Sequence, residues 1–283
     1  MTASIIDKTF KSIVAASAAL IMAASVAACG PSAATPSDEG STGSDSSSSS
    51  SATARTLDEI KKSGKLKVAV FSDKAPFGYV DKDGNYAGYD VYFAERLGKD
   101  LGVDVEYTSV DAAARVDVLT SNKVDITLAN FTVTDERKNV MDFSDSYATG
   151  IQSIIVPEGS DIASPDDLAG KMIGTQRGTT GYIYCSDDFG DDAVVAYDNG
   201  LTAVQALNNG QVDAVVIDNE PAKAYVESNP GLKILDTSYA EEDYAIGMAK
   251  GNTALEDAVN AALEELKADG TLQSIVDKYI TAE

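Results

Sequence analysis

Short apolar runs alternate with amphipathic stretches from residue 65 onward. The apolar runs are rich in β-branched residues and predict buried strands at residues 65–71, 103–107 and 124–129. Between them, residues 90–101 and 111–120 have the spacing of helices, and Asp90 is expected to cap the first of these. Because strands and helices alternate, the pattern predicts an α/β architecture with mostly parallel strands.

A second alternating series begins at Gly170. It contains the predicted strands KMIGTQ, AVVAY and VDAVVID, a loop RGTTG and the helix LTAVQALNN. Residues 119–130 (LTSNKVDITLAN) and 207–218 (LNNGQVDAVVID) share one arrangement, in which a Leu is followed by Val-Asp and then by a strand with a polar last residue. We interpret the match as two related lobes that present Asn130 and Asp218 at the carboxyl ends of strands, where open α/β sheets bind ligands. Unrelated helix–turn–strand units also look alike, so the match alone leaves both interpretations open.

The C-terminal part predicts two helices. The apolar positions of the first follow a helical spacing at Leu255, Val259, Ala262, Leu263 and Leu266. Gly270 ends this helix, and a second short helix extends through Tyr279. We expect both helices to cover the first lobe rather than to form a third domain.

The N-terminal residues have the layout of a secretory signal peptide. Lys8 and Lys11 precede an uncharged run that ends before Cys29, and the run is too short to cross a bilayer comfortably. Residues 1–28 are therefore predicted to be the signal peptide. Residues 26–29 (VAAC) resemble a lipobox, which predicts that Cys29 is diacylated and anchors the protein to the outer face of the bacterial cytoplasmic membrane. An ordinary signal-peptidase site with an incidental cysteine is the alternative.

Residues 29–54 contain mainly Ser, Thr, Gly, Pro and Asp, and predict a disordered tether behind the lipidated cysteine. The formal net charge of −23 argues against binding to nucleic acid, which requires clustered Lys and Arg. The chain has no histidine, and its two cysteines are Cys29 and Cys185, so zinc sites and histidine-based catalytic triads are unsupported. We expect no catalytic residue, metal or cofactor.

Three segments carry groups that could bind an ion. Arg137 in NFTVTDER offers a planar fork for a carboxylate, with Thr132 nearby and Thr134 as the helix N-cap. The loop RGTTG, residues 177–181, could present backbone N–H groups at a helix N-terminus. Asp218 could hold a cationic group. The alternatives are a surface ion pair for Arg137, a turn without a ligand for the loop, and a helix N-cap for Asp218. Opposite charges from opposite lobes would suit a zwitterion.

Together these segments resemble the type II periplasmic-type solute-binding proteins of amino-acid ABC importers, over nearly all of residues 55–283. The resemblance is carried by KLKVAVFSDKAPFGY, GYDVYFAERLGKDLG, KVDITLANFTVTDERKNVMDFSDSY, the GTT of residues 178–180, VDAVVIDNEPA and KADGTLQSIVDKY. It implies an α/β fold of two Rossmann-like lobes joined by a two-crossing hinge. Lobe 1 would comprise residues 55–149 plus 246–283, and lobe 2 residues 150–245, with crossings near residues 148–153 and 243–247.

The resemblance also implies roles for individual residues. Arg137, Thr132 and the backbone at Thr180, in the loop that contains Gly178, would hold the α-carboxylate of an L-amino acid. Asp218 and the carbonyl of Asn130 would hold its α-ammonium. Phe77, with Tyr79 or Tyr182, would supply an apolar wall. The implied partners are an ABC permease and its ATPase, and the protein is expected to be a monomer.

The chain departs from many members of this family in its first loop. Phe71 replaces an Asp of histidine- and glutamine-binding members, and Lys74 replaces a common aromatic residue, which disfavours a basic or glutamine ligand. The segments FSDKAPFGYVD and KVDITLANFT are similar to those of cysteine-binding members. Arg115 stands where aspartate/glutamate binders carry an Arg for the side-chain carboxylate, or it is a helix-surface charge. Cysteine, cystine, glutamate or aspartate is therefore the expected ligand. A cyclohexadienyl dehydratase-like enzyme and a ligand-sensing module are the alternatives.

Overall fold

The computed structural model describes residues 53–279, except the side chains of Val276 and Tyr279. The predicted signal peptide (1–28), the lipidated Cys29 and residues 29–52 of the tether lie outside the described residues and stay predictions. Within the described range, no helix combines the length and the apolar character that a membrane span requires.

The first of two large sheets has five strands. Their order is β5 (Asp104–Ser109), β1 (Lys65–Val70), β6 (Ile126–Thr127), β14 (Gly247–Ala249) and β7 (Met141–Phe143). β1 is parallel to β5 and β6, whereas β14 is antiparallel to β6 and β7. The strand predicted at residues 124–129 is thus much shorter than expected, and Asn130, three residues after its end, takes a left-handed conformation with φ of 47°.

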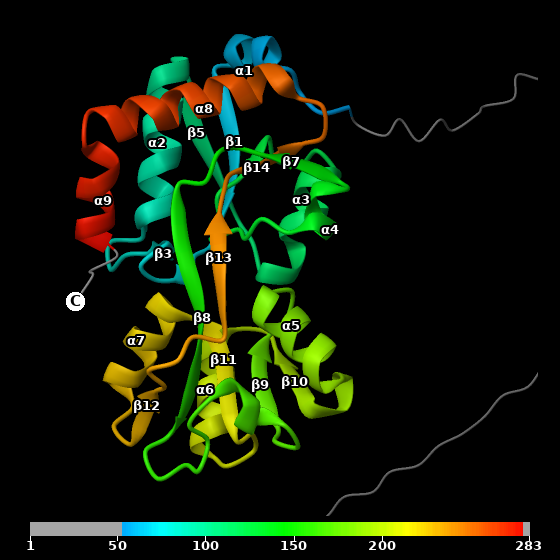
Figure 1. Ribbon diagram of the computed structural model, residues 1–283. Helices are drawn as coiled ribbons and strands as arrows, with labels where there is room; N and C mark the ends of the chain where they lie inside the picture. The colour runs from blue at the N-terminus through cyan, green and yellow to red at the C-terminus, as the bar shows by residue number, and fades with distance from the viewer. Residues whose placement is uncertain (1–52, 280–283) are drawn as a thin grey trace, which may run out of the picture. The chain divides into compact units, whose positions relative to one another are not determined.

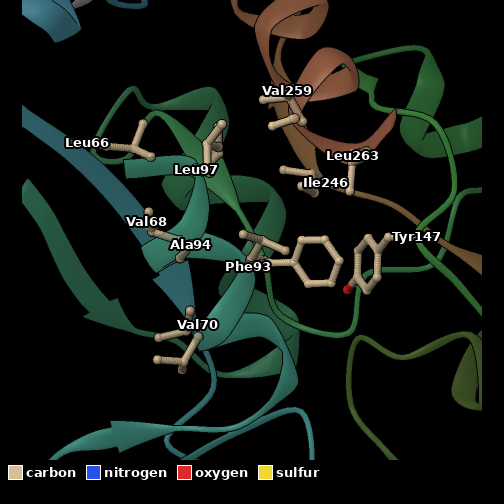
Figure 2. Close-up of a cluster of buried hydrophobic side chains, with 14 of the residues drawn as sticks. Leu66, Val68, Val70, Phe93, Ala94, Leu97, Tyr147, Ile246, Val259 and Leu263 are labelled. Atoms are coloured by element: carbon tan, nitrogen blue, oxygen red, sulfur yellow. The ribbon is translucent and has the colours of Figure 1, made fainter. Parts of the chain in front are cut away.

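Helices from both ends of the described chain cover this sheet. They are α1 (Leu57–Ser63), α2 (Tyr89–Leu101), α3 (Arg115–Thr120), α4 (Asp135–Lys138), α8 (Thr253–Ala268) and α9 (Thr271–Tyr279). Figure 2 shows Phe93 and Leu97 of α2 in one core with Val259 and Leu263 of α8. The apolar positions predicted for α8 are all buried, which confirms its amphipathic character.

The second sheet has six strands. Its order is β10 (Val194–Tyr197), β9 (Ile173–Gln176), β11 (Ala214–Asp218), β8 (Ala148–Pro157) and β12 (Leu232–Ile234), and β13 (Ala240–Tyr244) also pairs with β8. The helices of this lobe are α5 (Thr180–Phe189), α6 (Gly200–Asn208) and α7 (Asn219–Ser228). Short 3-10 helices are η1 (Ala112–Ala114), η2 (Pro165–Leu168) and η3 (Asp191–Ala193). The three strands predicted for this series are confirmed as β9, β10 and β11.

Two paired strands connect the sheets. β8 and β13 are antiparallel, with Ala148 opposite Tyr244 and Gln152 opposite Ala240, and Figure 1 shows them side by side between the two lobes. Val133 N in the first lobe donates to Asp243 O. The predicted two-lobe α/β fold with two hinge crossings is therefore present. The predicted lobe boundaries at 149/150 and 245/246 fall in or beside these strands.

A small three-stranded sheet, β2 (Asp73–Lys74), β3 (Gly78–Val80) and β4 (Tyr86–Ala87), leads into α2. Gly88, with φ of 118°, is the N-cap of α2 and allows Tyr89 N and Asp90 N to donate to the carbonyls of Pro76 and Phe77. The prediction that Asp90 caps this helix is wrong. Gly88 takes the N-cap position instead, because its φ of 118° suits glycine. Asp90 lies inside the first turn and is buried.

Candidate ligand-binding site

Asn130 and Asp218 lie just after β6 and at the end of β11, one in each lobe, and both are buried. Asn130 N donates to the Asp90 carboxylate at 2.9 Å, which fixes the left-handed turn after β6. Tyr147 OH donates to the other oxygen of Asp90 at 2.8 Å. Asn130, one of the two polar residues that the sequence singled out, is therefore held by a buried hydrogen bond.

The Asp218 carboxylate accepts hydrogen bonds from three neighbouring side chains. Lys74 Nζ, from β2 of the first lobe, lies 2.5 Å from Oδ2. Gln152 Nε2 and Tyr244 OH donate to Oδ1 at 3.1 and 2.9 Å. Burial alone would raise the pKa of Asp218, but Lys74 and the hydrogen bonds hold it below its usual value. Asp218 occupies the N-cap position of α7, yet its side chain does not cap the helix, so that alternative is wrong for the side chain.

Arg137 is buried within α4, and its surface ion-pair alternative is wrong. Thr134 caps α4 as predicted, with its hydroxyl accepting from Arg137 N. The guanidinium donates to Thr132 O at 2.7 Å and to Gly178 O, in the other lobe, at 3.3 Å. Burial lowers the pKa of Arg137.

Arg115 is 2% exposed, so the helix-surface alternative is wrong. Its guanidinium donates to the carbonyls of Ala112, Ala129 and Asn130 at 2.9 Å, and to Gly178 O at 3.0 Å. The Asn130 carbonyl, which was predicted to hold an ammonium, accepts one hydrogen bond from Arg115 in this structure. Burial and the nearby Arg137 lower the pKa of Arg115.

The loop RGTTG connects β9 to α5, as predicted, and Thr179 caps the helix that begins at Thr180. Gly178 has φ of 75°, and a Cβ there would lie 2.4 Å from Ala113 Cα in the first lobe. Only a glycine permits this contact between lobes. Its carbonyl consequently reaches both arginines.

Three cations and two aromatic rings alternate along the first lobe. Lys74 Nζ and Arg115 Cζ lie 5.2 and 5.4 Å from the centre of the Phe71 ring. Arg115 Cζ and Arg137 Cζ lie 4.7 and 4.5 Å from the centre of the Phe131 ring. Cation–π contacts of this kind partly replace the lost hydration of the buried cations. The first lobe thus holds three buried cations close together.

Phe77 is buried, packs edge-to-face on Tyr89 and Tyr244, and lines a cavity of about 430 Å³ beside the hinge. The cavity is also lined by residues of β8, β13 and the start of α7. The structure brings Phe77 to the hinge, whereas Arg115, Arg137 and Thr180 lie outside the lining of this cavity. Tyr79 and Tyr182 are half-buried and do not line it.

Glu242 on β13 also belongs to this region and was not predicted from the sequence. The side chain is 6% exposed, and Oε2 accepts from Thr132 Oγ1 at 3.0 Å and Gln152 Nε2 at 3.1 Å. Burial and the nearby Asp218 raise its pKa. Alternation along the strand could have found it, because Glu242 and Tyr244 are buried while Glu241 and Asp243 are exposed.

Buried polar atoms without a hydrogen-bond partner gather here. Among the described residues, they include both side-chain atoms of Asn130, Oε1 of Gln152 and Oε1 of Glu242. Each such group costs about 1–3 kcal/mol when it stays unpaired. A polar ligand between the lobes would supply partners for them.

The buried Asp90 predicts a specific pH dependence of stability. Burial raises its pKa to about 6, compared with about 3.9 in an unfolded chain. The folded state therefore binds this proton more tightly, and the contribution of Asp90 to stability falls as pH rises from about 4 to 6. Urea unfolding should show that Asp90→Asn gains on the order of 2 kcal/mol relative to the unchanged protein between pH 4 and pH 7.

The exposed Asp58→Asn on α1 is the matched control and should show no such change. A constant difference between Asp90→Asn and the unchanged protein across this range would contradict the assignment of the proton to Asp90.

Comparison with known proteins places this geometry in one family. The model of bacterial extracellular solute-binding proteins, family 3, matches residues 66–282. The L-cystine-binding protein TcyJ of Escherichia coli strain K12 is 32% identical over 231 residues, covering 80% of this chain and 86% of TcyJ. The cysteine-binding protein from Campylobacter jejuni has a TM-score of 0.75 and 34% identity, covering 80% of this chain and 92% of that structure.

A mutant of ArgBP from T. maritima has a TM-score of 0.75 and 36% identity, covering 80% of this chain and 99% of that structure. Relatives with this fold therefore differ in the ligand that their names state. The family model covers most of the chain, and the chain belongs to the bacterial extracellular solute-binding proteins of family 3.

Proposed function

We propose that this protein is the substrate-binding subunit of an ABC importer and captures a polar L-amino acid between its lobes. The observation that carries the proposal is the buried set of Arg137 in one lobe and Asp218 in the other, together with buried polar atoms of Asn130, Gln152 and Glu242 that have no hydrogen-bond partner. A zwitterion complements this set because it offers a carboxylate and an ammonium at a short distance.

Each proposed contact pairs a charged group of the ligand with groups of opposite charge or with hydrogen-bonding groups in the site. Arg137, Thr132 Oγ1 and the N–H of Thr180 at the start of α5 bind the α-carboxylate. Asp218 and the Asn130 carbonyl bind the α-ammonium. Contacts from both lobes favour the closed state when ligand is bound.

Three further residues would contact or enclose the side chain of the ligand. Arg115 and Gly178 shape the space between the lobes, and Phe77 provides an apolar wall. The ligand class that we propose is cysteine or cystine, or else glutamate or aspartate. Its support is the buried Arg115 cation and the ligands in the names of the E. coli and C. jejuni relatives.

The same proposal includes the cellular setting. The monomeric protein is anchored through diacylated Cys29 to the outer face of the cytoplasmic membrane and delivers its ligand to a permease and its ATPase. Mass spectrometry of the mature N-terminus tests the anchor, because an unmodified N-terminus would contradict it.

A thermal-shift screen tests the binding function. The purified mature protein is unfolded and refolded to remove bound ligand, then heated with each L-amino acid, cystine and prephenate. At a concentration of about 100 Kd, a ligand adds about 2.7 kcal/mol. For a chain of this size we therefore expect the Tm to rise by roughly 5–10 °C. A screen in which no amino acid raises Tm, or in which prephenate is consumed, would overturn the proposal.

A further inference from the structure

We propose that Lys74 and Glu242 are specificity-determining residues. Each binds a side chain that the ligand needs, Asp218 for Lys74 and Thr132 for Glu242, and an amino acid binds only by replacing both. This inference rests on the proposed function and deepens it. The two side chains together present one ammonium and one carboxylate, as a zwitterionic amino acid does.

Lys74 holds the ammonium position. Its Nζ lies 2.5 Å from Asp218 Oδ2, and both side chains are 5% exposed. The other carboxylate oxygen already accepts from Gln152 and Tyr244. A ligand ammonium therefore reaches Asp218 only when the lysine leaves. Four methylene groups give Lys74 the freedom to withdraw.

Glu242 holds the carboxylate position. Its Oε2 accepts from the hydroxyl of Thr132, which is one of the groups proposed for the ligand carboxylate. The same oxygen accepts from Gln152 Nε2 at 3.1 Å, so two hydrogen bonds hold the Glu242 carboxylate beside Thr132.

Charge balance explains why both must be replaced together. Removing one partner of a buried ion pair is costly because it leaves the other charge uncompensated. A whole amino acid supplies both charges, so Asp218 keeps a cationic partner while the ligand carboxylate takes the place of Glu242 on Thr132. A ligand with only an amine or only a carboxylate satisfies one of them and competes poorly with the internal pair. The site thereby rejects decarboxylated and deaminated analogues.

Isothermal titration calorimetry of the unchanged protein and Lys74→Met tests the competition. The probes are L-cysteine with cysteamine and 3-mercaptopropionate, and L-glutamate with 4-aminobutyrate, which lacks only the α-carboxylate, and glutarate, which lacks only the α-ammonium. For whichever amino acid binds, Lys74→Met should bind it at least tenfold more tightly and should bind the matching amine measurably. Lys74→Arg, which keeps the cation, should retain the affinity of the unchanged protein. Lys82→Met is the matched control, since its side chain is 89% exposed.

Glu242→Gln tests the carboxylate position. This variant should bind the matching carboxylate more tightly than the unchanged protein does. Weaker binding by Lys74→Met, or an unchanged affinity, would overturn the inference while leaving the proposed function intact. If no amino acid binds the unchanged protein, the proposed function fails.

A measurement without ligand separates these failures. Lys74 joins the two lobes through Asp218, so spin labels on the lobes should show longer distances in Lys74→Met than in the unchanged protein. Equal distances would also overturn the inference, whatever the binding data show.

Discussion

Arg137→Ala should lower the affinity for the amino acid that binds in the screen by at least about a hundredfold. Truncating one partner of a buried, hydrogen-bonded charge pair costs about 2–5 kcal/mol, and a hundredfold loss is about 2.7 kcal/mol. Arg137 as a whole is 6% exposed, so water cannot replace its guanidinium cheaply. Calorimetric titration of the purified mature protein with L-cysteine and L-glutamate would measure the loss.

Arg177→Ala is the matched control for Arg137. Arg177 belongs to the same loop as Gly178, but its side chain is 56% exposed. Removing it should change affinity less than threefold. Equal losses in the two variants would mean that general electrostatic attraction, rather than the buried fork of Arg137, binds the carboxylate.

Gly88→Ala should lower the free energy of unfolding by about 3 kcal/mol or more. A Cβ at Gly88 would lie 2.3 Å from Phe77 O and 2.7 Å from Pro76 O, and these backbone atoms cannot rotate away. The backbone at φ of 118° and ψ of −178° adds strain of about 1–3 kcal/mol for any other residue. Overpacking adds a similar amount. Urea unfolding followed by circular dichroism measures the change.

Gly84→Ala provides the comparison for Gly88. Gly84 also has a positive φ, of 85°, but an added Cβ would meet nothing within 4 Å. Its cost should stay at about 1 kcal/mol. If both substitutions cost the same, backbone conformation alone accounts for the loss and the contact with the Phe77 loop contributes nothing.

The elements of the fold followed from local patterns because each depends on nearby residues. Thr134 caps α4 because Ser and Thr hydroxyls pair with the N–H groups of a first helical turn. The strand before Asp218 is apolar along its length, as buried parallel strands are. Asp90 was misjudged because an acid near a helix start usually caps it, and the special conformation of Gly88 is not visible in a pattern of polarity.

The candidate site was only partly predictable because its pairs join distant positions. Lys74 and Asp218 are 144 residues apart, and Thr132 and Glu242 are 110 apart. Local patterns do not contain such pairings. Lys74 was noticed as a departure from the family, but its role became clear only when the lobes were placed together. The residue roles carried over from the family remain proposals.

The position of β14 determines when the first lobe can be completed. β14 lies between β6 and β7, but β13 and all of the second sheet precede it in the chain. During synthesis, every strand of the second sheet is therefore available before the fourth strand of the first sheet is. Until Gly247–Ala249 arrive, β6 and β7 have no strand between them, and their pairing waits for contacts of long sequence separation. A chain that stops short of β14 would thus leave the ribosome with β1, β5 and β6 able to pair but with β7 cut off from their sheet.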